Sequence, residues 1–106
     1  MSDFPILLVE DSRGSPGPAA RALEQLRGRP YTLVKASTLA EGIEHISRTK
    51  FAAAILDMTL RDGMGLPAFL RFQGKAGTIP IVVLIDRAYE DLGIEATRRG
   101  ALDYLI

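Results

Sequence analysis

The chain has 106 residues but no cysteine, no tryptophan and only one histidine, His45. Without cysteine it can form no disulfide, no thiolate metal site and no cysteine nucleophile. A single histidine also excludes a metal site built from several imidazoles. The absence of cysteine agrees with a reducing compartment, and we therefore expect the protein to be cytoplasmic.

The chain also has no excess of charge, because thirteen basic side chains balance thirteen acidic ones. It therefore lacks the electrostatic field that steers a protein toward nucleic acid or an anionic membrane surface. No apolar run approaches the roughly 20 residues needed to cross a bilayer, and the first five residues, MSDFP, carry no basic stretch of a secretion signal. We expect a domain with neither nucleic acid nor membrane as a partner.

The composition is 47% hydrophobic and 25% charged, as in an ordinary globular protein. A length of 106 residues suits a single hydrophobic core, so we expect one domain over residues 1–106. Runs of branched aliphatic residues predict five strands, at residues 4–9, 31–36, 52–56, 79–85 and 102–106. The third and fourth runs are apolar nearly throughout, which is typical of central parallel strands covered on both faces.

Helical spacing separates these strands. Apolar residues recur at i, i+4 and i+7 in Ala19, Leu23 and Leu26, and again in Leu39, Ile43 and Ile46. Thr38, with Glu41 three residues later, fits an N-cap of the second helix.

Two more helices are predicted, over residues 66–75, with Pro67 in the first turn and Gly74 or Gly77 at the end, and over residues 89–99, stopping at Gly100. Strict alternation of strand and helix predicts an α/β fold, a doubly wound parallel sheet of five strands in the order 2-1-3-4-5.

Acidic residues follow three of the predicted strands: Glu10 and Asp11 the first, Asp57 the third and Asp86 the fourth. In such a sheet, ligands bind outside the carboxyl ends of the strands. Carboxylates gathered there repel one another, and Mg²⁺ is the hard cation that such oxygen ligands favour. With Mg²⁺ beside it, Asp57 is suited to attack phosphorus and form an aspartyl phosphate.

Each of these acids also has a structural interpretation. A single Asp after a strand is more often a turn former or a helix cap than a catalyst. Asp11 would cap the first helix, although the Gly- and Pro-rich residues 13–18 delay that helix. For Asp86, capping or a surface position is the favoured interpretation, and Asp62 with Gly63 is most simply a turn.

Four segments resemble, in order and spacing, the hallmark segments of two-component response-regulator receiver domains. They are residues 6–12 (ILLVEDS), 54–66 (AILDMTLRDGMGL), 79–84 (IPIVVL) and 100–106 (GALDYLI). The resemblance covers essentially the whole chain and implies the CheY-like fold. It also implies a phosphoacceptor signalling domain, without enzymatic activity beyond self-catalysed phosphotransfer, whose donor is a histidine kinase or phosphotransfer protein.

The resemblance assigns roles to individual residues. Asp57 matches the phosphoacceptor, and Mg²⁺ would be held by Asp11, Asp57, the backbone carbonyl of Thr59 and, through water, Glu10. Tyr104 matches the aromatic switch position that turns inward on activation in many receivers.

Two departures from the family pattern bear on switching. Ile85 stands where the family has Thr or Ser, and Asp86 follows where a small residue is usual. The family's phosphate-binding Lys and fifth helix would come after Ile106, so we expect a chain truncated before that helix. Without that helix, the sheet face that it would cover would be an exposed apolar patch. We therefore expect self-association as a homodimer.

These departures keep open a pseudo-receiver, which uses the same fold as a phosphorylation-independent interaction module. Other classes fit less well. The G-x-G-x-x-A spacing of Gly63, Gly65 and Ala68 is a weak nucleotide-binding match, because Pro67 stands where the phosphate-binding helix should start. A phosphohydrolase of the aspartyl type needs an acid where Thr59 stands. A Ser-His-Asp arrangement would have to use His45, which lies off the apolar stripe of its predicted helix and is therefore expected on its exposed side.

Overall fold

The computed structural model describes residues 4–11, 17–25 and 30–106. Its centre is a parallel sheet of five strands in the order β2-β1-β3-β6-β7, as the strand and helix alternation predicted. The strands are β1 (Phe4–Val9), β2 (Tyr31–Ala36), β3 (Ala53–Asp57), β6 (Ile81–Leu84) and β7 (Asp103–Leu105). The predicted third, fourth and fifth strands are thus shifted or too long by one or two residues at their ends, where local propensity gives way to sheet pairing.

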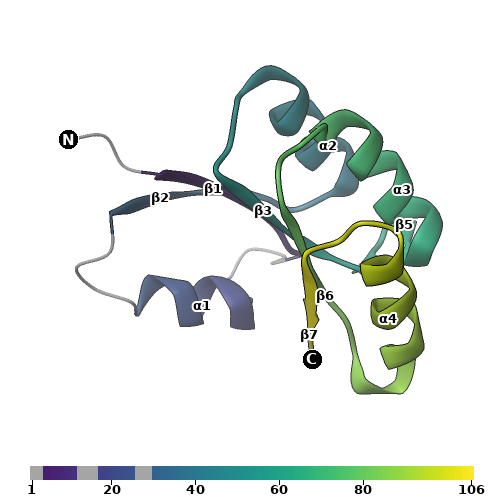
Figure 1. Ribbon diagram of the computed structural model, residues 1–106. Coiled ribbons are helices and arrows are strands. Elements are labelled where there is room, and N and C mark those ends of the chain that lie inside the picture. Colours follow the sequence, from purple (N-terminus) through teal and green to yellow (C-terminus); the bar gives the residue numbers. More distant parts are fainter. Residues whose placement is uncertain (1–3, 12–16, 26–29) are drawn as a thin grey trace.

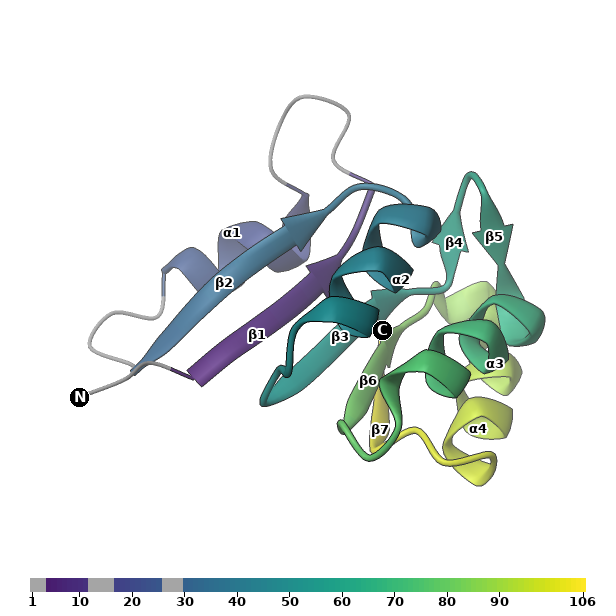
Figure 2. The same ribbon diagram turned by 90° about the horizontal axis from the view of Figure 1, so that it is seen from above.

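Helices cover both faces of the sheet, in unequal number. They are α1 (Pro18–Glu24), α2 (Leu39–Arg48), α3 (Gly65–Ala76) and α4 (Glu90–Arg98), the last preceded by the 3₁₀ turn η1 (Arg87–Tyr89). Figures 1 and 2 show that, of the helices in the described residues, α1 lies on one face and α2, α3 and α4 lie together on the other. Ala19 and Leu23 of the first predicted stripe are in α1, and Leu26 lies outside the described residues. None of the described helices has the length and apolar content needed to span a membrane.

The helix ends follow the local signals in the sequence. The Thr38 hydroxyl accepts a hydrogen bond from the Glu41 amide at 3.1 Å, so the predicted cap of α2 is confirmed. Pro67 lies in the first turn of α3, where its missing N–H costs no intrahelical bond. Gly77 and Gly100, with φ of 63° and 118°, reverse the chain after α3 and α4 in a region that favours glycine.

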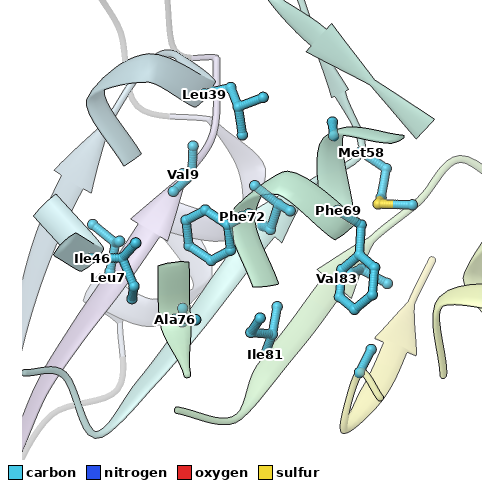
Figure 3. Packing of buried hydrophobic residues seen from close by; sticks show 14 of the residues in the cluster. Leu7, Val9, Leu39, Ile46, Met58, Phe69, Phe72, Ala76, Ile81 and Val83 are labelled. Atoms are coloured by element: carbon cyan, nitrogen blue, oxygen red, sulfur yellow. The ribbon is translucent and has the colours of Figure 1, made fainter. Parts of the chain in front are cut away.

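The core lies between the sheet and the three-helix layer. Figure 3 shows Phe69 and Phe72 of α3 pointing onto β1, β3 and β6, close to Val9 and Val83. Both rings are fully buried and are the largest such side chains among the described residues. At Gly42 of α2 a Cβ would lie 2.7 Å from a Val9 methyl, so the lack of a side chain lets this helix approach β1.

A short hairpin between β3 and α3 was not predicted. It consists of β4 (Thr59–Leu60) and β5 (Gly63–Met64), paired antiparallel. The prediction of a turn at Asp62 and Gly63 is one residue off, because Gly63 is already paired with Leu60 and the turn residues are Arg61 and Asp62. Leu60 is fully buried, and this burial anchors the hairpin against the core.

Candidate phosphoacceptor site

The acidic residues lie at one edge of the sheet, as expected for the carboxyl ends of parallel strands. In the sheet register Val9 pairs with Leu56 and Asp57 with Leu84, so Glu10 follows β1 directly beside the end of β3. These strands are adjacent in the centre of the sheet, where strand order reverses. The position is the one at which open parallel sheets bind ligands.

Asp57 is the last residue of β3, and Thr59 fixes the orientation of its half-buried side chain. The Thr59 amide donates to Asp57 Oδ1 at 2.9 Å, and the Thr59 hydroxyl donates to the same oxygen at 2.7 Å. No described residue donates a hydrogen bond to the second oxygen, Oδ2. One carboxylate oxygen is therefore held in place while the other is available for chemistry.

Glu10 has a structural task that sequence reasoning missed. Its side chain, only 8% exposed, accepts hydrogen bonds from the amides of Ala19 at 3.1 Å and Ala20 at 3.2 Å, at the start of α1. A Cβ on Gly17 would lie 2.5 Å from the Glu10 carboxylate, so glycine leaves room for this contact. Glu10 thus accepts hydrogen bonds from amides that the first helical turn leaves free. The sequence analysis had considered this capping role for Asp11. Pro18, at the first helical position, was the available signal for where α1 begins.

Asp11 forms an ion pair with Arg61, the first turn residue of the β4–β5 hairpin. Arg61 Nε lies 3.6 Å from Asp11 Oδ2. The Asp11 side chain is 21% exposed, whereas that of Arg61 is 64% exposed. This pair was not predicted from the sequence, because the hairpin that brings Arg61 near Asp11 was not predicted either.

The arrangement can be tested against the requirements of a metal ion. Among the described residues, no three acidic or histidine side chains come together in a way that could hold one. A cage of three carboxylates is therefore not what Glu10, Asp11 and Asp57 form. Mg²⁺ typically takes one or two carboxylates and completes its octahedron with carbonyl oxygens and water. Asp11 and Asp57 carry carboxylates and Thr59 a backbone carbonyl, which are the kinds of oxygen donor that this smaller requirement calls for.

The two residues that depart from the family pattern lie beside Asp57. Ile85 is buried, with 5% of its surface exposed, and the Asp86 carboxylate accepts a hydrogen bond from the Ala88 amide at 3.1 Å. Asp86 is thus the N-cap of η1, so the capping interpretation is confirmed. A hydroxyl is missing at position 85, and no charge is buried at position 86.

Tyr104, on the edge strand β7, packs its ring against α4. A Cβ on Gly93 would lie 2.8 Å from the ring, so this side chain occupies the space that the glycine leaves. Its hydroxyl donates to Glu90 Oε2 at 2.8 Å, and this hydrogen bond, with the nearby negative charge, raises the pKa of Tyr104 above its ordinary value. In this structure α4 therefore holds the ring of Tyr104 at both ends.

A cavity of about 510 Å³ opens on the face that carries α1. Its lining is partly polar and partly apolar. The polar lining residues include Glu10, Asp57, Thr59 and Asp86, and the apolar ones include Ala22, Leu23, Ile55, Leu84, Ile85, Leu105 and Ile106. Asp57 thus faces an accessible space, as a phosphoryl donor would require.

No family model matches the chain. The acid tolerance regulatory protein ActR of Rhizobium meliloti is 30% identical to it over 103 residues, which are 97% of this chain and 52% of ActR. The receiver domain of the sensor histidine kinase PA1611 from Pseudomonas aeruginosa, with magnesium coordinated in its active-site cleft, has the same fold, with a TM-score of 0.73, 22% identity and coverage of 98% and 84%.

A response regulator from Burkholderia pseudomallei, with a phosphorylated aspartic acid, calcium and citrate, gives a TM-score of 0.75 and 27% identity. It is matched over 97% of this chain and 59% of its own. The chain is a response-regulator receiver domain. It spans about half the length of the curated relative ActR. The resemblance of the four segments to receiver domains is thereby confirmed.

Proposed function

We propose that this receiver domain accepts a phosphoryl group on Asp57, with Mg²⁺ as cofactor and a histidine kinase or phosphotransfer protein as donor. Asp11, Asp57 and the Thr59 carbonyl would hold the ion directly, and Glu10 through water. The domain acts as a phosphoacceptor in signalling, and its chemistry is limited to transfer onto its own carboxylate. The observation that carries the proposal is the geometry of Asp57 at the end of central strand β3.

Asp57 has the two properties that a phosphoacceptor needs. Its Oδ1 is fixed by two hydrogen bonds from Thr59, which limits rotation of the carboxylate. Its side chain also borders the cavity on the α1 face, so a donor can approach it. A carboxylate that is oriented and accessible in this way is prepared for attack on phosphorus.

The transfer conserves atoms and electrons. An oxygen of Asp57 attacks the phosphorus of a phosphohistidine whose other ring nitrogen carries a proton. A new O–P bond forms, and the P–N bond breaks with its electrons going to the imidazole. The product is an aspartyl phosphate and a neutral histidine on the donor. When bound, Mg²⁺ offsets the negative charge that develops on the transferring oxygens.

Glu10 supports this site through the fold as well as through charge. Its carboxylate is occupied by the amides of Ala19 and Ala20, so α1 is attached directly at the acidic edge. Glu10 therefore contributes negative potential and positions the helix that forms one wall of the cavity.

Ile85 weakens the link from phosphorylation to conformational change. A hydroxyl at this position would donate to the phosphoryl group, and a hydrogen bond to a charged group contributes about 1.5–3 kcal/mol. A tenfold shift between two conformations needs about 1.4 kcal/mol. We therefore expect Asp57 to be phosphorylated with little shift in the population of Tyr104 conformations, and Ile85→Thr to increase that shift.

Intact-protein mass spectrometry after incubation with Mg²⁺ and acetyl phosphate tests the acceptor assignment. We expect one added phosphoryl group on the wild type and none on Asp57→Asn, which keeps the shape of the side chain. Asp86→Asn is the matched control, because Asp86 lines the same cavity. It should be modified like the wild type.

Two results would contradict the acceptor assignment. A phosphoryl group retained in Asp57→Asn would place the acceptor elsewhere. A wild type that stays unmodified, even with a histidine phosphotransfer protein as donor and in a chain extended beyond Ile106, would favour the pseudo-receiver.

The predicted homodimer remains a proposal. Leu105 and Ile106, which line the cavity on the α1 face, are 51% and 56% exposed to solvent. Burying these side chains against a second copy would remove apolar surface from water. Light scattering at micromolar concentration should give a mass above that of the monomer; a monomeric mass would contradict self-association.

A further inference from the structure

The turn of the β4–β5 hairpin is attached to the rest of the fold at two points. Asp62 Oδ1 accepts a hydrogen bond from the Leu39 amide at 2.8 Å, and its Oδ2 accepts one from the Ala40 amide at 3.0 Å. A Cβ on Gly63 would lie 2.4 Å from a Leu39 methyl, so the backbone also packs tightly against α2. The turn is therefore held in place from the side of α2.

Arg61, the other turn residue, extends from this fixed base toward the acidic edge. Because Asp62 and Leu60 hold the backbone on both sides, the position of the Arg61 Cα is determined. Its guanidinium reaches Asp11, with Nε 3.6 Å from Oδ2. The hairpin thus delivers a permanent positive charge to one of the acids beside the phosphoacceptor.

This charge has a clear electrostatic effect. Glu10 and Asp11 follow β1, and Asp57 ends the adjacent strand β3, so three negative charges lie at one edge of the sheet. Like charges brought near one another destabilise one another. Arg61 partly neutralises the group through Asp11. Another cation that binds Asp11 must therefore displace the Arg61 guanidinium or share the Asp11 carboxylate with it.

We propose that Arg61 is a tethered counter-ion of Asp11 that competes with Mg²⁺ and so sets the affinity of this receiver domain for the metal. The inference rests on the proposed function, since it takes Asp11 as a metal ligand. Arg61 is here a residue that tunes the site and touches no reacting atom.

The pair is suited to exchange. The Arg61 side chain is 64% exposed, and its long aliphatic stem can turn into solvent without uncovering the core. The contact is one Nε–Oδ2 approach at 3.6 Å, longer than a charge-assisted hydrogen bond. Exposed pairs of this kind are weak. Arg61 should therefore lower the affinity for Mg²⁺ without preventing binding.

The test is a Mg²⁺ titration of the unphosphorylated domain at fixed ionic strength, by isothermal titration calorimetry or amide chemical shifts. Arg61→Gln should bind Mg²⁺ about two- to fivefold more tightly than the wild type. Arg61→Lys keeps the positive charge and should stay close to the wild type. Arg48→Gln is the matched control, because Arg48 is also an exposed arginine paired with an acid, Glu44, at 3.3 Å on α2.

A double-mutant cycle locates the effect. Asp11→Asn should bind Mg²⁺ more weakly than the wild type. Adding Arg61→Gln to it should no longer tighten binding, because the partner of the guanidinium is gone. An undiminished gain in that background would show that Arg61 does not act through Asp11 and would overturn the inference.

Other outcomes separate the two proposals. Equal affinities for wild type and Arg61→Gln, with binding still dependent on Asp11, would overturn the role of Arg61 and leave the proposed function standing. If Arg48→Gln tightened Mg²⁺ binding as much as Arg61→Gln, the effect would come from net charge alone, and the proposed role of Arg61 would also be overturned. If Asp11→Asn binds Mg²⁺ like the wild type, the proposed metal site fails and the inference about Arg61 fails with it.

Discussion

The two faces of the sheet are packed very differently. Toward α2, α3 and α4 the strands present fully buried side chains such as Leu7, Leu56 and Val83. Toward α1 the alternate positions of β3, β6 and β7 are partly open: Ile55 and Leu84 are half-buried and Leu105 is 51% exposed. One face is a closed core, and the other borders a cavity.

Asp57 belongs to the open face. Alternate residues of a strand point to the same side, so Asp57 shares its side with Ile55, whereas Leu56 between them enters the core. Two neighbours in sequence thereby serve different purposes. The closed face supplies most of the hydrophobic stabilisation, and the open face leaves space around the acceptor.

The largest expected effect is on stability, and it is tested by making the same substitution, leucine to alanine, on each face of the sheet. Leu56→Ala removes a fully buried side chain from the closed face and should destabilise the domain by about 2–5 kcal/mol. Leu84→Ala makes the same change beside the cavity, where less contact is lost, and should cost about 1 kcal/mol. Urea unfolding followed by circular dichroism measures both.

The comparison of the two faces would fail if the two leucine variants were equally destabilised. As a control, the unfolding free energy of both variants should depend on urea concentration with the same slope as that of the wild type, because a changed slope would indicate an altered unfolded state. If Leu84→Ala proved the more damaging change, the α1 face would be as tightly packed as the other.

A smaller effect is expected where the hairpin attaches to the closed face. Asp62→Ala removes the acceptor for the Leu39 and Ala40 amides at the start of α2 and should cost about 1 kcal/mol. That corresponds to a fall of about 4–8 °C in Tm for a domain of this size. Glu44→Ala, an exposed change within the same helix, should leave Tm nearly unchanged.

The contribution of Asp62 should depend on pH. The hydrogen bonds from the Ala40 and Leu39 amides hold the pKa of Asp62 below its ordinary value. Stability from a lowered carboxyl pKa is present above the unfolded value near 4 and is lost as pH falls through the folded pKa. The difference in Tm between wild type and Asp62→Ala should therefore shrink in acid, and a difference independent of pH would exclude the charged cap.

The fold was largely predictable because its signals are local and repeated. Periodicity identified the five strands of the main sheet and the helices between them, and Thr38, Gly77 and Gly100 marked where helices begin or end. The positions of Asp57 and Asp86 followed from strand order. Each of these predictions needed only the spacing of residue types along a short window.

The missed features depend on contacts between distant segments. Asp62 contacts amides more than twenty positions earlier, and Arg61 pairs with an acid on another strand end. The two-residue strands of the hairpin are also too short to show an alternating pattern. For Glu10, the sequence could show an acid beside the site, but only the fold shows that its carboxylate is held by α1.

The smallest expected effect lies at the outer edge of the closed face, where Tyr104 binds Glu90. Tyr104→Phe removes only the hydroxyl that donates to Glu90, so the fall in Tm should be smaller than for Asp62→Ala. Since the pKa of Tyr104 is raised, the protonated phenol stabilises the fold at every pH below its ordinary value near 10, and this contribution is lost as pH rises through the folded pKa. Melting curves of both proteins should thus differ by a constant amount at neutral pH and converge in strong alkali. If they differ by the same amount throughout, the hydroxyl does not donate to Glu90, and the ring is held by its packing on Gly93 alone.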